Sequence, residues 1–276
     1  STFKWVTATE ALNSGKWTPD SVFNDTGKFT VYGQVIRNDG GVKFGTNTLT
    51  DALTFSINTT FANIGTALGA KALGTQMTKY GFGQPTSIDL PSNEVAVSGR
   101  YRNGKLLSNT QRDEDVARIA IGQENLQVTP LQMAMVAGAV ANGGRMMRPY
   151  LVKRVITPDG VVVRQQRAEQ LSTAASAYVA SEVGRMMQNV VKEGTAAQAG
   201  LSGLSVAGKT GTAETGTQGL NDAWFIGYAP IDNPRVAVAV VIEDSSGTGG
   251  QVAAPIAGQV ISTALSSQPV QGDPAP

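Results

Sequence analysis

The first residues of the chain place a hydroxyl and an amine close enough to react. Ser1 and Lys4 are three positions apart, and on a helix such residues share one face, with Cβ atoms about 5–6 Å apart. A lysine there can remove the serine proton if its pKa falls from about 10.4 toward neutrality. The same spacing also occurs by chance, with the serine as a helix cap and the lysine in solvent. Taken alone, the pair leaves both interpretations open.

The composition removes the common alternatives to a lysine base. The 276 residues include no histidine and no cysteine. This excludes a Ser-His-Asp triad, a Cys-His pair, histidine metal sites and disulfides. The formal net charge of +1 provides no basic footprint for nucleic acid. We expect no metal, no other cofactor and no nucleic-acid partner.

Two further short motifs accompany Ser1 and Lys4. One is Ser56-Ile57-Asn58, in a helix-loop-helix setting, and the other is Lys209-Thr210-Gly211, at the start of a predicted strand. Each alone is weak, because Ser-x-Asn is often a turn and Lys-Thr-Gly is often a surface strand end. Penicillin-binding proteins and class A β-lactamases combine all three motifs. The combination predicts a serine enzyme that forms an acyl intermediate.

Over most of its length the chain resembles the transpeptidase domain of class B penicillin-binding proteins. Near the C-terminus, Thr248-Gly249-Gly250 followed by Ala253-Ala254-Pro255-Ile256 is most similar to the actinobacterial penicillin-binding protein A group. Beyond Ser1-Thr2-Phe3-Lys4, the matching segments are Ala120-Ile121-Gly122-Gln123, Thr129-Pro130-Leu131-Gln132-Met133-Ala134, Lys209-Thr210-Gly211-Thr212-Ala213-Glu214 and Ala223-Trp224-Phe225-Ile226-Gly227-Tyr228-Ala229-Pro230.

The resemblance implies a role for each residue of the first two motifs. Ser1 would be acylated by the D-Ala–D-Ala end of a peptidoglycan stem peptide. Lys4, crowded by Lys209 and partly desolvated, would be neutral and act as the general base. Ser56 would relay a proton to the leaving amine. Asn58 would hold the substrate amide and help to orient Lys4.

The third motif would bind the substrate. By the same resemblance, Lys209 keeps the local potential positive, and Thr210 and Thr212 bind the terminal carboxylate of the substrate. Gly211 would let the substrate backbone approach the strand edge, where a side chain would block it. The backbone N–H groups of Ser1 and Thr212 would form the oxyanion hole.

The implied function is a peptidoglycan D,D-transpeptidase, which passes the acyl group to an acceptor amine and so cross-links the cell wall. β-Lactams would be covalent inhibitors, and proteins of cell-wall synthesis or division would be partners. The catalytic domain would lie on the extracytoplasmic side of the cell membrane. No stretch approaches the roughly 18 apolar residues of a membrane span. The resemblance implies strands of the central sheet before the nucleophile helix, so we expect those strands, a non-catalytic domain and a membrane anchor upstream of Ser1.

Three other functions compete with this one. A D,D-carboxypeptidase differs only in using water as the acceptor, and it stays open. A β-lactamase shares the first step, but the chain lacks the Glu-x-x-Leu-Asn pattern of class A and has Ser56-Ile57-Asn58 where class D has Ser-x-Val. An N-terminal-nucleophile hydrolase would use the α-amine of Ser1 as its base, which leaves Lys4 and Lys209 without a function.

The patterning predicts an α/β fold of the α+β type, with a mainly antiparallel central sheet covered by helices, and the resemblance adds an all-helical subdomain. The transpeptidase domain would cover 1–266, and the Ser-, Gln- and Pro-rich residues 267–276 would form a disordered tail. We expect Trp5, Trp224 and the apolar side chains of 131–141 in the core, and Glu214 as a solvated charge. The expected strands of the sheet are 206–212, 223–228 and 236–243, and a separate hairpin pairs 151–156 with 161–165. Helices are expected over 1–12, 58–73, 131–141, 173–193 and 252–265, and one more is capped by Thr50 and Asp51. Residues 81–115 are expected to be loop-like until Asp113-Glu114-Asp115 starts a helix.

Overall fold

A three-stranded antiparallel sheet forms the centre of the domain. The computed structural model describes residues 1–111, 115–201 and 203–267. The strands are β12 (Ala207–Glu214), β13 (Asn221–Ala229) and β14 (Val236–Ser245), in the order β12-β13-β14. The predicted run of three consecutive strands is confirmed. Within the described residues β12 has one strand partner only, β13, so no strand pairs with its other edge.

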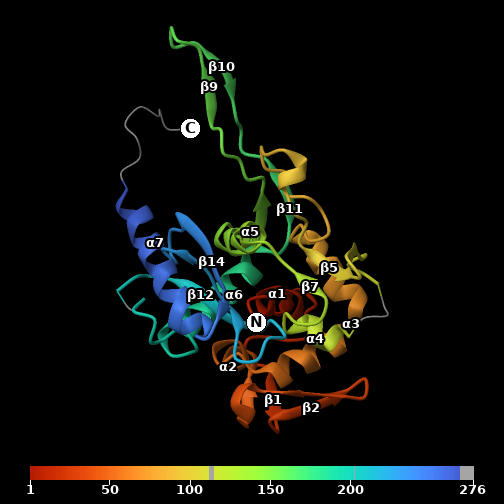
Figure 1. The fold of residues 1–276 in the computed structure, drawn as a ribbon. Coiled ribbons are helices and arrows are strands. Elements are labelled where there is room, and N and C mark those ends of the chain that lie inside the picture. Colours follow the sequence, from red (N-terminus) through yellow and green to blue (C-terminus); the bar gives the residue numbers. More distant parts are fainter. Residues whose placement is uncertain (112–114, 202, 268–276) are drawn as a thin grey trace.

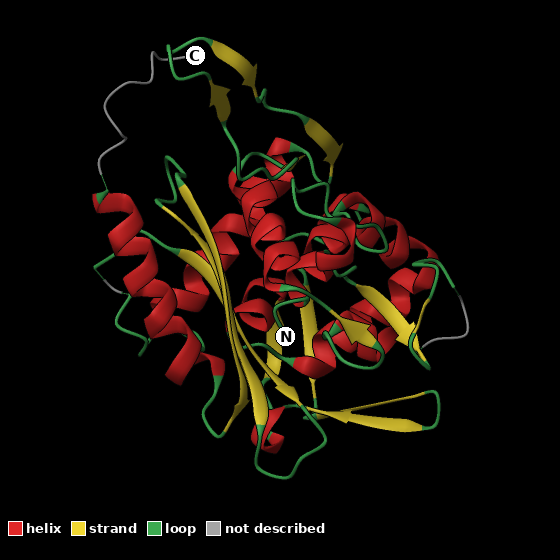
Figure 2. Ribbon diagram, turned by 45° about the horizontal axis from the view of Figure 1, so that its top comes forward, coloured by secondary structure: helices red, strands yellow, loops and turns green. Residues whose placement is uncertain are grey.

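Helices cover both faces of this sheet. Helix α7 (Ala254–Ser266) packs against β13 and β14, and it is preceded by a π-helical turn, η3 (Gly249–Ala253). Figure 2 shows α7 on one side of the sheet and most other helices on the opposite side. There, α5 (Pro130–Ala141) contacts β14 and α6 (Ala177–Lys192) contacts β12. This arrangement confirms the predicted α+β layers.

A helical part surrounds the buried helix α1 (Lys4–Asn13), which contacts α3 (Asn58–Lys79), α4 (Val116–Ala120) and α6. Helix α3 continues past the predicted end at residue 73, across an interruption at Gly69 (φ 78°, ψ 163°). The short helix α2 (Leu49–Thr54) is capped by Thr48 rather than by Thr50, because Thr48 and Asp51 form a reciprocal capping box.

Short antiparallel strands form small sheets outside the central sheet. The predicted hairpin at 151–165 is confirmed and projects from the body of the molecule (Figure 1). The segment 81–115 was expected to be loop-like. Its described part instead contains the strands β5 and β6 and the 3₁₀ turn η2. The peripheral elements are β1 (Val22–Asp25), β2 (Lys28–Val31), β3 (Gln34–Arg37), β4 (Gly45–Thr48), β5 (Gly99–Arg102), β6 (Lys105–Leu106), β7 (Leu126–Gln127), β8 (Arg145–Met147), β9 (Arg154–Ile156), β10 (Val162–Gln165), β11 (Gln170–Thr173), and the 3₁₀ turns η1 (Asp39–Gly41) and η2 (Ser92–Glu94).

The core predictions hold in part. Within 131–141 the buried apolar side chains are Met133, Val136, Ala137, Ala139 and Val140, whereas Leu131, Ala134, Met135 and Ala141 are half-buried. Trp5 is fully buried and Glu214 is exposed, as expected, but Trp224 is only half-buried. Asp115 caps α4, whereas the other two residues of the acidic run and residues 268–276 of the expected tail lie outside the described part. None of the helices in the described ranges is both long and apolar enough to span a bilayer.

Candidate active site

The start of the chain lies between the sheet and the helical part, as the N label shows in Figures 1 and 2. Residues Ser1–Phe3 form a turn that leads into α1, and the Lys4 N–H donates to the Ser1 carbonyl oxygen at 3.2 Å. This turn places the two side chains on one face. Nζ of Lys4 lies 3.0 Å from Oγ of Ser1, within hydrogen-bonding distance, so the predicted serine–lysine pair is formed.

Ser56 contributes two more partners for the same amine. Nζ of Lys4 lies 2.9 Å from the carbonyl oxygen of Ser56 and 3.0 Å from its Oγ. Ser56 has a left-handed backbone (φ 59°), which costs a residue with a side chain roughly 1–2 kcal/mol. That conformation turns both oxygens of one residue toward Lys4. The strain at Ser56 is therefore linked to the geometry of the site.

Asn58, at the first turn of α3, completes the environment of Lys4. Its Oδ1 accepts from Nζ of Lys4 at 2.6 Å, while its Nδ2 donates to the carbonyl oxygen of Arg37 on β3 at 3.0 Å. Since a carbonyl oxygen cannot donate, the Arg37 contact determines which end of the Asn58 amide faces the lysine. The predicted role of Asn58 in orienting Lys4 thus has a structural basis.

Burial lowers the basicity of both lysines in the site. Lys4 is fully buried, and its pKa lies well below the usual value, first because of desolvation and second because of the nearby positive charge of Lys209. Burial lowers the pKa of Lys209 to about 7. Ser1, Ser56 and Asn58 are half-buried, so a ligand can reach the hydroxyl groups while the amine beneath them stays shielded from water.

Strand β12 brings the third motif to the start of α1. Nζ of Lys209 donates to the Thr210 carbonyl oxygen at 3.0 Å. A Cβ atom on Gly211 would lie 3.2 Å from the backbone nitrogen of Thr2 and from Cβ of Trp224, tighter than ordinary contact. The absent side chain of Gly211 therefore has a packing role that the sequence did not reveal, because it allows β12 to lie against the turn that precedes α1.

The hydroxyl groups of Thr210 and Thr212 already have partners within the protein. Oγ1 of Thr210 lies 2.5 Å from Oγ1 of Thr195, and Oγ1 of Thr212 accepts from the Gly249 N–H at 3.3 Å. Thr195 belongs to none of the motifs in the sequence and lies just beyond the helix predicted for 173–193. Its position depends on packing between distant segments, which no local motif encodes.

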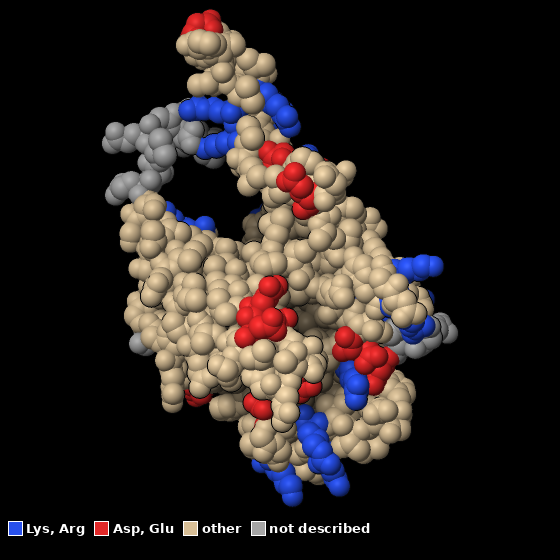
Figure 3. Space-filling view, viewed as in Figure 1, with Lys and Arg blue, Asp and Glu red and all other residues tan. Residues whose placement is uncertain are grey.

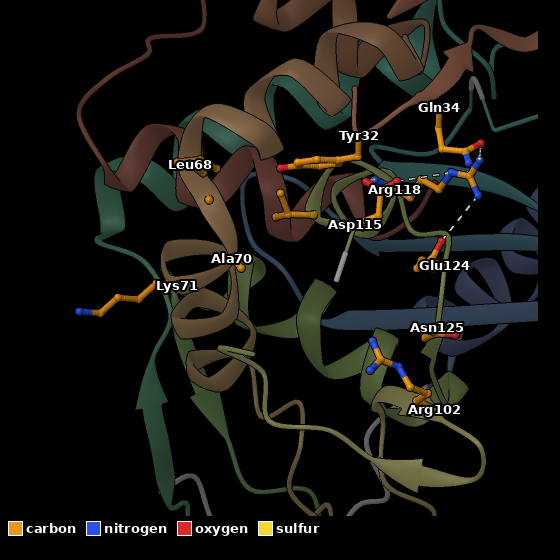
Figure 4. A pocket seen from close by; sticks show the side chains of 12 residues that line it. Tyr32, Gln34, Leu68, Ala70, Lys71, Arg102, Asp115, Arg118, Glu124 and Asn125 are labelled. Atoms are coloured by element: carbon orange, nitrogen blue, oxygen red, sulfur yellow. Dashed lines mark hydrogen bonds and ion pairs between the residues drawn. The ribbon is translucent and has the colours of Figure 1, made fainter. Parts of the chain in front are cut away.

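A cavity of about 840 Å³ adjoins this site without including Ser1 or Lys4. It lies at the bend of α3, and Arg118 reaches from α4 toward the carboxylates of Asp115 and Glu124, at 3.7 and 3.6 Å (Figure 4). The segment that carries Glu124 also approaches Ser1, because a Cβ atom on Gly122 would lie 3.1 Å from the Ser1 nitrogen. On the face drawn in Figure 3, charges of both signs are scattered and no extended basic patch forms.

Comparison with known proteins gives one consistent answer. Residues 1–262 match the family described as penicillin binding protein transpeptidase domain. The peptidoglycan D,D-transpeptidase PbpA of Mycolicibacterium smegmatis is 35% identical, with 96% of this chain and 54% of that protein covered. Stage V sporulation protein D of Bacillus subtilis is 33% identical, with 96% and 41% covered. The chain thus spans about half the length of the PbpA relatives that it matches.

Solved structures agree with the sequence relatives. Penicillin-binding protein A of Mycobacterium tuberculosis, described as an acyl-enzyme complex, superposes with a TM-score of 0.84 at 33% identity, covering 96% of this chain and 60% of that one. The same protein as a penicillin G acyl-enzyme complex has a TM-score of 0.81. These mycobacterial relatives confirm the expected similarity to the penicillin-binding protein A group. The chain belongs to the penicillin-binding protein transpeptidase domain family.

Proposed function

We propose that this domain is a peptidoglycan D,D-transpeptidase whose acyl-accepting nucleophile is Ser1. The observation that carries the proposal is the position of the Lys4 amine, within 3.0 Å of Ser1 Oγ, Ser56 Oγ and Asn58 Oδ1. The names of the relatives, peptidoglycan D,D-transpeptidase among them, support the choice of reaction.

The hydrogen bonds around Lys4 suit a neutral amine. Such an amine has two N–H donors and one lone pair. The Ser56 carbonyl and Oδ1 of Asn58 can only accept, so they take the two protons. The lone pair then faces the hydroxyl groups of Ser1 and Ser56, which can donate to it. Together with the depressed pKa of Lys4, this makes the amine a suitable general base.

Acylation follows from this arrangement. Lys4 takes the proton of Ser1 as Oγ attacks the carbonyl carbon between the two D-alanines. The carbonyl π electrons move onto oxygen, where the N–H groups of Ser1 and Thr212 would stabilise the charge. When the C–N bond breaks, the leaving nitrogen takes a proton from Ser56, which regains one from Lys4. The products are an ester on Ser1 and free D-alanine.

Transfer to the acceptor reverses these steps. An amine of a second stem peptide attacks the ester and loses a proton through Lys4 and Ser56, and Ser1 leaves with its hydroxyl restored. A β-lactam would acylate Ser1 in the same way, but its leaving nitrogen stays tethered to the acyl group. The acyl-enzyme structures of relatives at 33% identity support this expectation for β-lactams.

We also propose that the domain works on the extracytoplasmic side of the cell membrane, because the polymer that it would cross-link lies there. A membrane anchor outside the residues described here, and partners from cell-wall synthesis or division, complete this proposal. Fractionation of cells that express the full-length protein tests the membrane location. Recovery in the soluble fraction after lysis would contradict it.

Intact-mass measurement with benzylpenicillin tests the enzymatic proposal. We expect one added β-lactam mass per chain, with the label on the peptide that contains Ser1. The variants Ser1→Ala and Lys4→Ala should remain unlabelled over the same time. With a D-Ala–D-Ala peptide and an acceptor amine, the cross-linked product should exceed the hydrolysed one. An excess of hydrolysed peptide would favour a carboxypeptidase, and rapid turnover of nitrocefin would favour a β-lactamase.

A further inference from the structure

Three threonine side chains lie on or beside β12, and the hydroxyl groups of two of them are in hydrogen-bond contact. Thr210 and Thr212 lie two positions apart on the strand, so they share the face opposite to that of Lys209. The third hydroxyl belongs to Thr195, which follows α6 and lies 2.5 Å from the Thr210 hydroxyl. Thr210 is 5% exposed, whereas Thr195 is exposed to solvent. Thr195 is therefore the member of this pair that an incoming ligand meets first.

Close backbone packing holds Thr195 in place. Its N–H donates to the carbonyl oxygen of Thr54 at 3.4 Å. A Cβ atom on the neighbouring Gly194 would lie 2.3 Å from that same oxygen, and a Cβ atom on Gly250 would lie 2.3 Å from the Thr195 carbonyl oxygen. No side chain fits at either glycine. The backbone at Thr195 is thus fixed relative to both the segment that precedes Ser56 and η3.

The hydrogen bonds that Thr195, Thr210 and Thr212 make within the protein leave some of their hydroxyl protons free for a ligand. A backbone N–H can only donate, so the bond from Gly249 uses an acceptor site of the Thr212 oxygen and leaves its proton available. In the pair formed by Thr195 and Thr210, one proton lies between the two oxygens and the other is free. The three hydroxyl groups therefore offer two protons to a ligand.

We propose that Thr195 is a specificity-determining residue: its hydroxyl accepts from Thr210 and, together with the Thr212 hydroxyl, donates to the terminal carboxylate of the donor peptide. This inference rests on the proposed transpeptidase function. A carboxylate has two acceptor oxygens and no donor, so it matches the two free protons. Hydrogen bonds to an ionised group are roughly twice as strong as neutral ones. A C-terminal amide or ester, which lacks the charge, gains less from Thr195.

Acylation rates of benzylpenicillin and its methyl ester test this role. Thr195→Val keeps the shape of the side chain but removes the hydroxyl, and it should slow acylation by the free acid about ten- to a hundredfold. Acylation by the ester should change less than about threefold. Thr195→Ser, which restores the hydroxyl, should restore the rate with the acid. Thr75→Val, at an exposed position of α3, is the matched control and should alter neither rate.

Binding to a Ser1→Ala protein separates this inference from the proposed function. There, Thr195→Val should weaken binding of a peptide that ends in a D-Ala–D-Ala carboxylate and leave binding of its C-terminal amide unchanged. If this discrimination is found but the wild-type chain is not acylated, the transpeptidase function fails and the role of Thr195 stands. If Thr195→Val affects acid and ester alike, or neither, Thr195 has no role in carboxylate recognition.

Discussion

The amide oxygen of Asn58 lies 2.6 Å from the amine of Lys4, and it is the shortest of the four contacts of that amine with protein oxygens. The Arg37 carbonyl holds the other end of the amide. A neutral acceptor in this position accepts a proton of Lys4 without adding negative charge. It thereby supports the low pKa of Lys4, which a carboxylate would raise.

The variant Asn58→Asp tests this relationship. The added charge should favour the protonated form of Lys4 and raise its pKa, so that acylation by benzylpenicillin at pH 7 falls by about a hundredfold or more. The lost rate should partly return as the pH rises. The measurement is the second-order acylation rate constant as a function of pH. Asn63→Asp, at an exposed position of the same helix, should behave as wild type, and an unchanged profile for Asn58→Asp would contradict the assigned base.

The pKa of Lys209 predicts a second pH effect. Because that pKa is about 7, Lys209 loses its positive charge as the pH rises through neutrality, and attraction for a substrate carboxylate weakens. We expect the wild-type acylation rate to decline above about pH 7. Lys209→Arg, whose guanidinium stays protonated, should remove the decline. A wild-type rate that rises steadily to pH 9 would show that the charge of Lys209 is not required.

The same buried amines should make stability depend on pH. The pKa values of Lys4 and Lys209 are lower in the folded than in the unfolded chain, so the unfolded state binds more protons between the two values. The free energy of unfolding should therefore rise as the pH increases from about 7 toward 10.5. Lys209→Met should reduce this slope and raise the melting temperature at pH 7, while acylation is lost. A melting temperature below that of the wild type would contradict the unfavourable burial of this amine.

Two substitutions of Ser56 separate the effect of its left-handed backbone on stability from the proposed role of its hydroxyl in proton transfer. Ser56→Gly removes the hydroxyl but accepts the left-handed conformation, so it should stabilise the fold by about 1 kcal/mol. Ser56→Ala removes the same hydroxyl and keeps the strain. Both variants should slow acylation by about 10²–10⁴-fold, the usual size of a general acid–base contribution. Thermal unfolding and acylation rates of the pair check this, and equal melting temperatures would show that Ser56 is not strained.

The residues of the motifs could be predicted because their identity and order are local properties of the sequence. The central strands could also be predicted, since residues Val236–Ile242 of β14 form a continuous apolar run. Trp224 was misjudged because strand alternation puts it on the face opposite to the buried side chains of Ala223 and Phe225. Thr195 is placed by contacts among segments far apart in the chain, so local patterning carries no signal for it.

The contact between β12 and the turn that precedes α1 yields the last prediction. Gly211→Ala would place a Cβ atom 3.2 Å from the Thr2 nitrogen and the Trp224 side chain, so the strand must shift by a few tenths of an ångström. That shift separates Thr212 from Ser1, and misplacement of this kind should slow acylation by about ten- to a hundredfold. Gly138→Ala, where the new atom meets only Ala237 at 3.7 Å, is the matched control and should leave the rate unchanged. A Gly211→Ala protein with wild-type acylation would mean that the oxyanion site tolerates movement of β12, and would remove Thr212 from the proposed mechanism.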